Sequence, residues 1–120
     1  MGSSTSKATI GTFLKAFKAK MLDLGLEFVP RKQNLDGLAW LGITIEEAER
    51  IILALTDSEY CQGPENDRQG SPGQIYVFGA TVEGETIYIK LKLSDDSAKC
   101  LSFHPAAFTM RLPHKKDRKS

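Results

Sequence analysis

The chain has 120 residues, 41% of them hydrophobic and 26% charged, a composition typical of one globular domain. Sixteen Lys and Arg residues against fifteen Asp and Glu leave a net charge of +1. This balance excludes the strongly basic profile of many nucleic-acid binders and the acidic profile of disordered chains. Short apolar runs and a polar start without a signal region predict one cytoplasmic domain over residues 1–120, with flexible ends at 1–6 and 114–120.

Apolar side chains between residues 6 and 24 recur every three or four positions and so share one face of a predicted helix. They are Ile10, Phe13, Leu14, Phe17, Met21 and Leu24. Residues 26–42 are less regular, because Pro30 is incompatible with a helix interior. Asn34 could cap a short helix after it, since a side-chain amide accepts from the first free backbone N–H groups.

The clearest helix start in the chain is Thr44, followed three residues later by Glu47. This pair forms a capping box and predicts a second helix over residues 45–55. Residues 60–73 are rich in Gly, Pro, Asn, Asp and Gln, which predicts a long loop. Loops of this length inside a compact domain are often functional.

Three strand-like segments follow, over residues 74–80, 85–93 and 98–104. Apolar and polar residues alternate along them with the period of two that β-strands have, and turn residues at 82–85 and 95–97 separate them. Helices followed by strands predict an α+β fold, with two N-terminal helices packed on one face of a C-terminal antiparallel sheet.

Cys61 and Cys100 are too few for a disulfide scaffold or a zinc site. Two reduced thiols are the simplest interpretation, and a disulfide between them is the alternative. The sequence contains no Gly-rich phosphate loop, HExxH motif or GxSxG motif. We expect the activity to need no metal or other cofactor.

Alternation assigns each strand residue to one of two faces of the predicted sheet. The residues expected to cover the helices are Ile75, Val77, Ile87, Ile89, Leu91, Leu101 and Phe103. Those expected on the outward face are Gln74, Tyr76, Phe78, Tyr88, Lys90, Lys92, Cys100, Ser102 and His104. Imidazole carries protons near neutral pH, lysine attracts phosphate, and aromatic rings stack on unpaired bases, so this face suits RNA. The alternative is an ordinary solvated sheet face.

The charge is unevenly distributed along the chain. Residues 99–120 carry six basic side chains and one acidic side chain, a net charge of +5. The basic tail that begins at His114 fits either contact with a polyanion or a solvated terminus. The near-neutral total therefore does not exclude a local basic strip.

Four short segments, taken in order, form a further pattern. They are Leu55-Thr56 with Tyr60-Cys61-Gln62-Gly63-Pro64 and Asp67, Ile75-Tyr76-Val77-Phe78-Gly79, Ile87-Tyr88-Ile89-Lys90-Leu91, and Cys100-Leu101-Ser102-Phe103-His104-Pro105. Over residues 44–108 the chain thus resembles the MqsR family of type II toxin–antitoxin toxins. The resemblance implies a RelE/barnase-like fold and a metal-independent endoribonuclease that cleaves mRNA. It also implies a cognate antitoxin protein as partner.

The resemblance places the family's catalytic tyrosine on Tyr88 and a neighbouring lysine on Lys90. His104 stands where the family has a lysine, and imidazole can exchange a proton where an ammonium group mainly stabilises charge. We therefore expect Tyr88 and His104 to transfer protons and orient the 2′-hydroxyl while Lys90 and Lys92 hold the scissile phosphate.

Two further positions of the family pattern differ in this chain. Gln62 falls on or near a family lysine, and Lys92 or Arg68 could supply the missing cation. The family's glutamine corresponds to Gln74 or Tyr76.

The sequence thus predicts a set of site residues for cleavage by 2′-hydroxyl attack on phosphate. The predicted catalytic residues are Tyr88, His104 and Lys90, and the predicted RNA-binding residues are Lys92, Tyr76, Phe78, Gln62, Asp67 and Arg68. The alternative is a non-catalytic RNA-binding or protein-interaction module that uses the same sheet face; it would bind RNA in a salt-sensitive way without cutting it.

Overall fold

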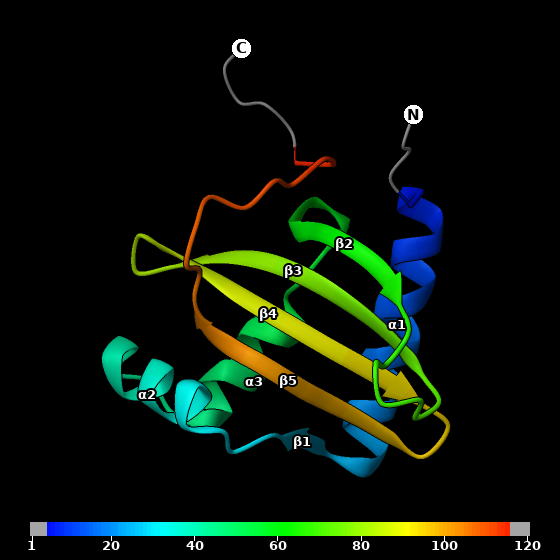
Figure 1. Ribbon diagram of the computed structural model, residues 1–120, viewed down its shortest axis with the longest axis horizontal. Helices are drawn as coiled ribbons and strands as arrows, with labels where there is room; N and C mark the ends of the chain where they lie inside the picture. Colours follow the sequence, from blue (N-terminus) through cyan, green and yellow to red (C-terminus); the bar gives the residue numbers. More distant parts are fainter. Residues whose placement is uncertain (1–4, 116–120) are drawn as a thin grey trace.

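The computed structural model describes residues 5–115 (Figure 1). Their helices and strands are α1 (Lys7–Leu24), β1 (Leu26–Phe28), α2 (Lys32–Leu41), α3 (Ile45–Leu53), a 3-10 helix η1 (Asp57–Glu59), β2 (Tyr60–Glu65), β3 (Gln74–Val82), β4 (Glu85–Ser94) and β5 (Ser97–Pro105). Helices followed by a mostly antiparallel sheet confirm the predicted α+β class. None of the helices in the described range has the length and apolar character that crossing a membrane requires.

The sheet has five strands in the order β1-β5-β4-β3-β2. The pairs β2–β3, β3–β4 and β4–β5 are antiparallel. Strand β1 lies parallel to β5, with Leu26 opposite Ala98. The sequence did not predict β1 or β2. Because β2 occupies the first half of the predicted 60–73 loop, the irregular segment is reduced to residues 66–73.

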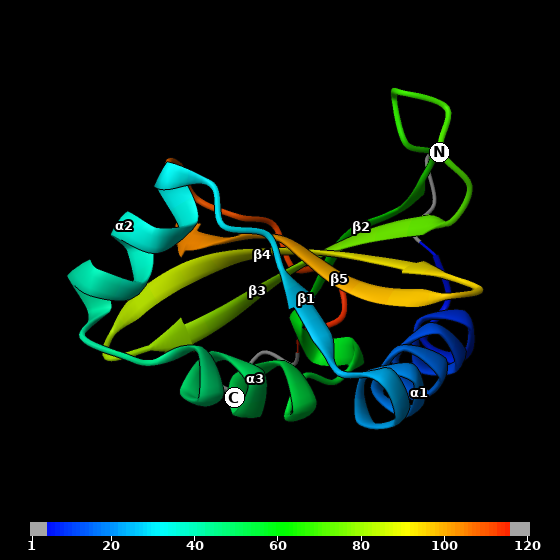
Figure 2. The same cartoon turned by 90° about the horizontal axis from the view of Figure 1, so that it is seen from below.

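Helices α1 and α3 cover one face of the sheet (Figure 2). Helix α1 begins at its N-cap Ser6, whose hydroxyl accepts from the Thr9 N–H at 3.2 Å. Its predicted apolar face is buried except for Leu24, which is exposed at the C-terminal end. The capping box that begins α3 is confirmed: the Thr44 N–H donates to the Glu47 carboxylate at 2.9 Å, and the Glu47 N–H donates back to the Thr44 hydroxyl at 3.1 Å.

The side chains of strand β3 point to the faces of the sheet opposite to those predicted. Tyr76 and Phe78 are buried on the helix face, and the Tyr76 ring stacks on the Phe13 ring of α1 with centroids 4.1 Å apart. Ile75 and Val77 therefore lie on the other face, paired with Lys92 and Lys90 of β4. We expected the smaller aliphatic residues in the core, but burial of a large aromatic ring contributes more free energy.

Strand β5 contains a bulge that also changes the predicted faces. Lys90 lies opposite Ser102 and Leu91 opposite Cys100, which leaves Leu101 without a partner on β4. Cys100 consequently joins the core, and Leu101 turns to the open face, the reverse of their predicted positions. Burial raises the pKa of the Cys100 thiol to about 12, and Cys100 and Cys61 are both free thiols.

Helix α2 lies along the β5 edge of the sheet and begins at its N-cap Arg31 rather than at the predicted Asn34. Asn34 is buried inside the helix, where its amide bonds the β5 backbone beyond the end of β1. The side-chain NH₂ donates to the carbonyl oxygens of Val29 and Leu101 at 2.9 and 3.0 Å, and its oxygen accepts from the Phe103 N–H at 3.1 Å. One side chain thus replaces a neighbouring strand at this edge.

Replacing Asn34 with alanine removes all three hydrogen bonds and leaves the buried Phe103 N–H without its side-chain acceptor. We expect a loss of about 3 kcal/mol of unfolding free energy and a fall of roughly 10 °C in Tm, measured by thermal and urea denaturation. Leu35→Ala, an exposed position on the same helix, is the matched control and should change the stability by less than about 0.5 kcal/mol. Equal stability of the two variants would show that the Asn34 bonds do not hold this edge.

Thr5 and His114 are described residues within the segments 1–6 and 114–120, for which we predict flexibility. The Thr5 hydroxyl donates to the Gly63 carbonyl at 2.5 Å, and His114 Nε2 donates to the Thr5 carbonyl at 2.7 Å. The His114 ring also lies 5.7 Å from the Tyr60 ring. Residues 1–4 and 116–120, which include most of the basic tail, lie outside the described residues.

Candidate functional site

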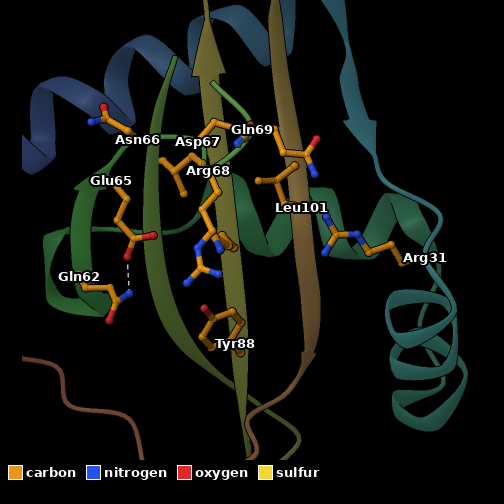
Figure 3. A pocket seen from close by; sticks show the side chains of 11 residues that line it. Arg31, Gln62, Glu65, Asn66, Asp67, Arg68, Gln69, Tyr88 and Leu101 are labelled. Carbon is orange, nitrogen blue, oxygen red and sulfur yellow. Dashed lines mark hydrogen bonds between the residues drawn. The ribbon is translucent and has the colours of Figure 1, made fainter. Parts of the chain in front are cut away.

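The sheet face opposite α1 and α3 carries a groove of about 740 Å³ under the 66–73 loop, here called the sheet groove (Figure 3). The residues that line it come from β2, the loop, β3, β4, β5 and the segment before α2. They are Arg31, Gln62, Glu65, Asn66, Asp67, Arg68, Gln69, Ile75, Tyr88, Lys90 and Leu101. The groove therefore joins parts of the chain up to 70 residues apart.

The sheet groove brings together part of the predicted site: Gln62, Asp67, Arg68, Tyr88 and Lys90. The prediction that Tyr76 and Phe78 stack on bases is wrong, because both side chains are buried under the helices and cannot reach RNA.

Tyr88 and His104 lie directly opposite each other on β4 and β5. Their rings are stacked, with centroids 5.4 Å apart and planes inclined by 15°. Burial raises the pKa of Tyr88, and the nearby carboxylate of Glu65 and thiol of Cys61 raise it further. Since the ordinary pKa of tyrosine is already about 10, Tyr88 keeps its phenolic proton at neutral pH and has it available to donate to a ligand.

The orientation of the His104 ring follows from its backbone contact. Nδ1 lies 3.0 Å from the carbonyl oxygen of Pro105, which can only accept. Nδ1 therefore carries the proton of this bond, and Nε2 is left to exchange a proton with a ligand. Gly37 of α2 permits this packing, because a Cβ there would lie 3.0 Å from His104 Cα and 2.9 Å from the Phe103 carbonyl oxygen.

Glu65 is a site residue that the sequence did not reveal. It lies at the end of β2, lines the sheet groove and accepts a hydrogen bond from the Gln62 side chain (Figure 3). Both Glu65 and Tyr88 line the groove, and the Glu65 carboxylate is a cause of the raised pKa of Tyr88, second to burial. No sequence signal points to it, because residues 60–65 show no apolar alternation and their composition predicts a loop.

Three cationic side chains line the sheet groove: Arg31 from the segment before α2, Arg68 from the loop and Lys90 from β4. Figure 3 shows the Arg68 guanidinium extending from the loop toward Tyr88. Within residues 5–115, none of the three is in an ion pair. Their charge is therefore available to an anion in the groove. Arg31 was not predicted, since an isolated arginine after Pro30 carries no motif.

Lys92 and Asp67 have a different role from the one predicted. Lys92 Nζ donates to Asp67 Oδ2 at 2.7 Å, and the two side chains are only 6% and 22% exposed. The other Asp67 oxygen accepts from the Gln69 N–H at 2.7 Å. Because the charges neutralise each other and the Asp67 acceptors are occupied, the pair anchors the 66–73 loop to β4 rather than contacting RNA.

We expect the loop anchor to persist in mild acid. The hydrogen bond from Lys92 holds the pKa of Asp67 below its ordinary value, and the Gln69 N–H adds to this effect. A carboxylate with a lowered pKa stabilises the folded state fully above its unfolded pKa, about 4, and the contribution is lost as the pH falls through the lower folded value. Protease cleavage within residues 66–73 should accordingly stay slow down to about pH 4 and rise below it.

Removing Asp67 should destabilise the 66–73 loop more than removing its partner Lys92. Asp67→Asn leaves the buried Lys92 ammonium without a counter-charge, whereas Lys92→Met leaves the more exposed Asp67 carboxylate to water. Proteolysis of the loop should therefore be fastest in Asp67→Asn, and in that variant it should no longer rise below about pH 4. Faster proteolysis in Lys92→Met than in Asp67→Asn would contradict the assignment.

The geometry of the sheet groove is thus that of an anion site with proton-carrying groups beside it: a phenol held protonated, an imidazole, a carboxylate and three cations. Comparison of the chain with protein-family models, with curated protein sequences and with solved structures finds no match.

Proposed function

We propose that this protein is a metal-independent endoribonuclease that cleaves mRNA, the toxin of a type II toxin–antitoxin system with a RelE/barnase-like fold. The observation that carries the proposal is that Glu65, Tyr88 and three cations line one open groove, and that the His104 ring stacks on Tyr88 at its side. The cations attract a phosphodiester, and the other three groups can donate and accept protons beside it. The resemblance to MqsR toxins supports the toxin role and a cognate antitoxin as partner.

The order of the strands separates the two proton-transfer groups. Glu65 on β2 and His104 on β5 lie on opposite sides of β4, which carries Tyr88. In the proposal, a phosphate above Tyr88 has the His104 imidazole directly opposite on β5. The Glu65 carboxylate reaches it along the groove from β2, where Glu65 is in register with Ile75 and Lys92. Acid–base cleavage needs this arrangement, because the nucleophile and the leaving group lie in line on opposite sides of phosphorus.

In the proposed reaction, Glu65 takes the proton of the 2′-hydroxyl, and the 2′-oxygen attacks the adjacent phosphorus. The bond from phosphorus to the 5′-oxygen breaks, and His104 gives its Nε2 proton to that oxygen. The products are a 2′,3′-cyclic phosphate and a 5′-hydroxyl end, and exchange with water restores both protein groups. Tyr88 donates a hydrogen bond to a non-bridging oxygen.

The cations stabilise the extra negative charge that forms on the phosphate during attack. Lys90 approaches from β4, Arg68 from the loop and Arg31 from the side of α2. Two of these three are arginines, whose planar guanidinium groups can bind two phosphate oxygens at once. Lys90 thus keeps its predicted role, and Arg68 supplies a cation in place of Lys92.

The proposal is tested by incubating the purified chain with end-labelled single-stranded RNA in EDTA. We expect fragments that end in 2′,3′-cyclic phosphate and no cleavage of the all-DNA analogue, which lacks the attacking hydroxyl. Induced expression should arrest growth, and Tyr88→Phe should relieve the arrest. Salt-sensitive binding that leaves the RNA intact would instead identify a non-catalytic RNA-binding module.

A further inference from the structure

A second hollow, of about 470 Å³, lies on the other side of His104 from the sheet groove and is here called the Trp40 hollow. It is lined by Gln33, Asp36, Gly37, Trp40, Glu85, His104 and Pro105. Trp40 is the only tryptophan of the chain and is 63% exposed. An exposed indole ring gains little of the free energy that burial of a large aromatic side chain provides. Trp40 therefore contributes little to the core, and its position suits contact with a ligand.

The geometry of α2 places Trp40 beside the proposed reaction centre. Gln33, Gly37 and Trp40 are spaced by four and three residues and so share one face of the helix. The close contact between Gly37 and β5 at His104 brings this face against the end of the strand. His104 lines the Trp40 hollow and stacks on Tyr88, which lines the sheet groove, so the two sites lie on either side of this stacked pair.

The charge of the Trp40 hollow is opposite to that of the sheet groove. Its acidic side chains are those of Asp36 and Glu85, and none of the described residues that line it is Lys or Arg. Asp36 also accepts from Lys32 at 2.7 Å in an exposed pair, which contributes little. Carboxylates disfavour phosphate but accept hydrogen bonds from amino groups on base edges. The hollow is therefore suited to a base and not to the RNA backbone.

We propose that the Trp40 hollow binds the unpaired nucleobase next to the phosphate held over Tyr88. Trp40 stacks on the base, and the Glu85 and Asp36 carboxylates favour a base that carries an exocyclic amino group over uracil. This inference rests on the proposed RNA-cleaving function and adds a specificity subsite to it. Exposed aromatic side chains commonly serve unpaired bases in this way.

The single tryptophan makes the subsite directly observable. Titration with 3′-CMP and 3′-UMP, whose bases differ only at the 4-position and in the proton on N3, should quench the Trp40 fluorescence, with tighter binding of 3′-CMP. Glu85→Gln should narrow the difference between the two nucleotides. No quenching by either nucleotide, or equal binding of both by the unaltered protein, would overturn the proposal.

The second test uses an RNA oligonucleotide with 2′-deoxy substitutions, which binds but is not cut. Trp40→Ala should bind it about tenfold more weakly, as expected for the loss of one stacked base. Leu35→Ala, which changes a 45% exposed side chain of the same helix outside the hollow, should bind it like the unaltered protein.

The outcomes separate the subsite from the proposed enzyme. RNA cleavage with unchanged affinity in Trp40→Ala would overturn the subsite and leave the nuclease standing. Quenching and weaker binding without any cleavage of natural RNA would support the subsite and overturn the nuclease.

Discussion

His104→Ala should lower the rate of RNA cleavage about 10²–10⁴-fold, the usual contribution of a positioned general acid. The ring stacks on Tyr88, its Nδ1 is engaged by the Pro105 carbonyl, and its Nε2 is left to donate to the leaving oxygen. The measurement is single-turnover cleavage of labelled RNA at saturating protein, so that a change in binding does not enter.

A substrate with a different leaving group tests the role of His104 as the acid. In RNA with sulfur in place of the bridging 5′-oxygen, the leaving thiolate departs without a proton. His104→Ala should therefore cleave this substrate almost as fast as the unaltered protein does. A loss as large as that on natural RNA would contradict the acid role and leave only a structural one.

Glu65→Gln should also lower the rate about 10²–10⁴-fold, because the neutral amide cannot take the proton of the 2′-hydroxyl. Glutamine keeps an oxygen that can accept from Gln62, so the geometry of β2 is preserved. The sulfur-containing substrate should not rescue this variant, since the base acts on the attacking group and not on the leaving group. The two variants thus differ in a way that a general loss of folding would not produce.

A spectroscopic readout checks Glu65 without any RNA. The carboxylate is a cause of the raised pKa of Tyr88, second to burial. In Glu65→Gln the pKa of Tyr88 should accordingly fall but stay above its ordinary value, because the burial remains. Ultraviolet titration of the phenol, with Tyr88→Phe to identify its signal, measures this change. An unaltered Tyr88 titration would show that the carboxylate is too distant to share the site.

Part of the candidate site could be predicted from local pattern. The strict alternation from Ile87 to Leu91 assigns Tyr88 and Lys90 to one face, and the register with β5 adds His104 to it. Strand periodicity is a property of the backbone and holds whatever the strand packs against. The capping box at Thr44 was predictable for the same reason, since it involves neighbouring residues alone.

Other parts of the site depend on contacts between distant residues. Whether Tyr76 or Ile75 enters the core is decided by Phe13, more than sixty residues away, whose ring stacks on Tyr76. The bulge at Leu101 and the Asn34 amide that bonds β5 arise from pairing between elements. No local pattern in this chain encodes these choices, because competing apolar residues alternate equally well in either orientation.

The sequence by itself determined the α+β class, the apolar face of α1, the capping box of α3 and the shared face of Tyr88, Lys90 and His104, because each follows from the spacing of nearby residues. Only the tertiary structure decided which charges are available. It paired Lys92 with Asp67, left Arg31 and Arg68 open to the groove, and brought Glu65 and Trp40 to the two sides of the Tyr88–His104 stack. Charge pairing and burial are properties of three-dimensional neighbours, and these neighbours are set by packing rather than by order along the chain.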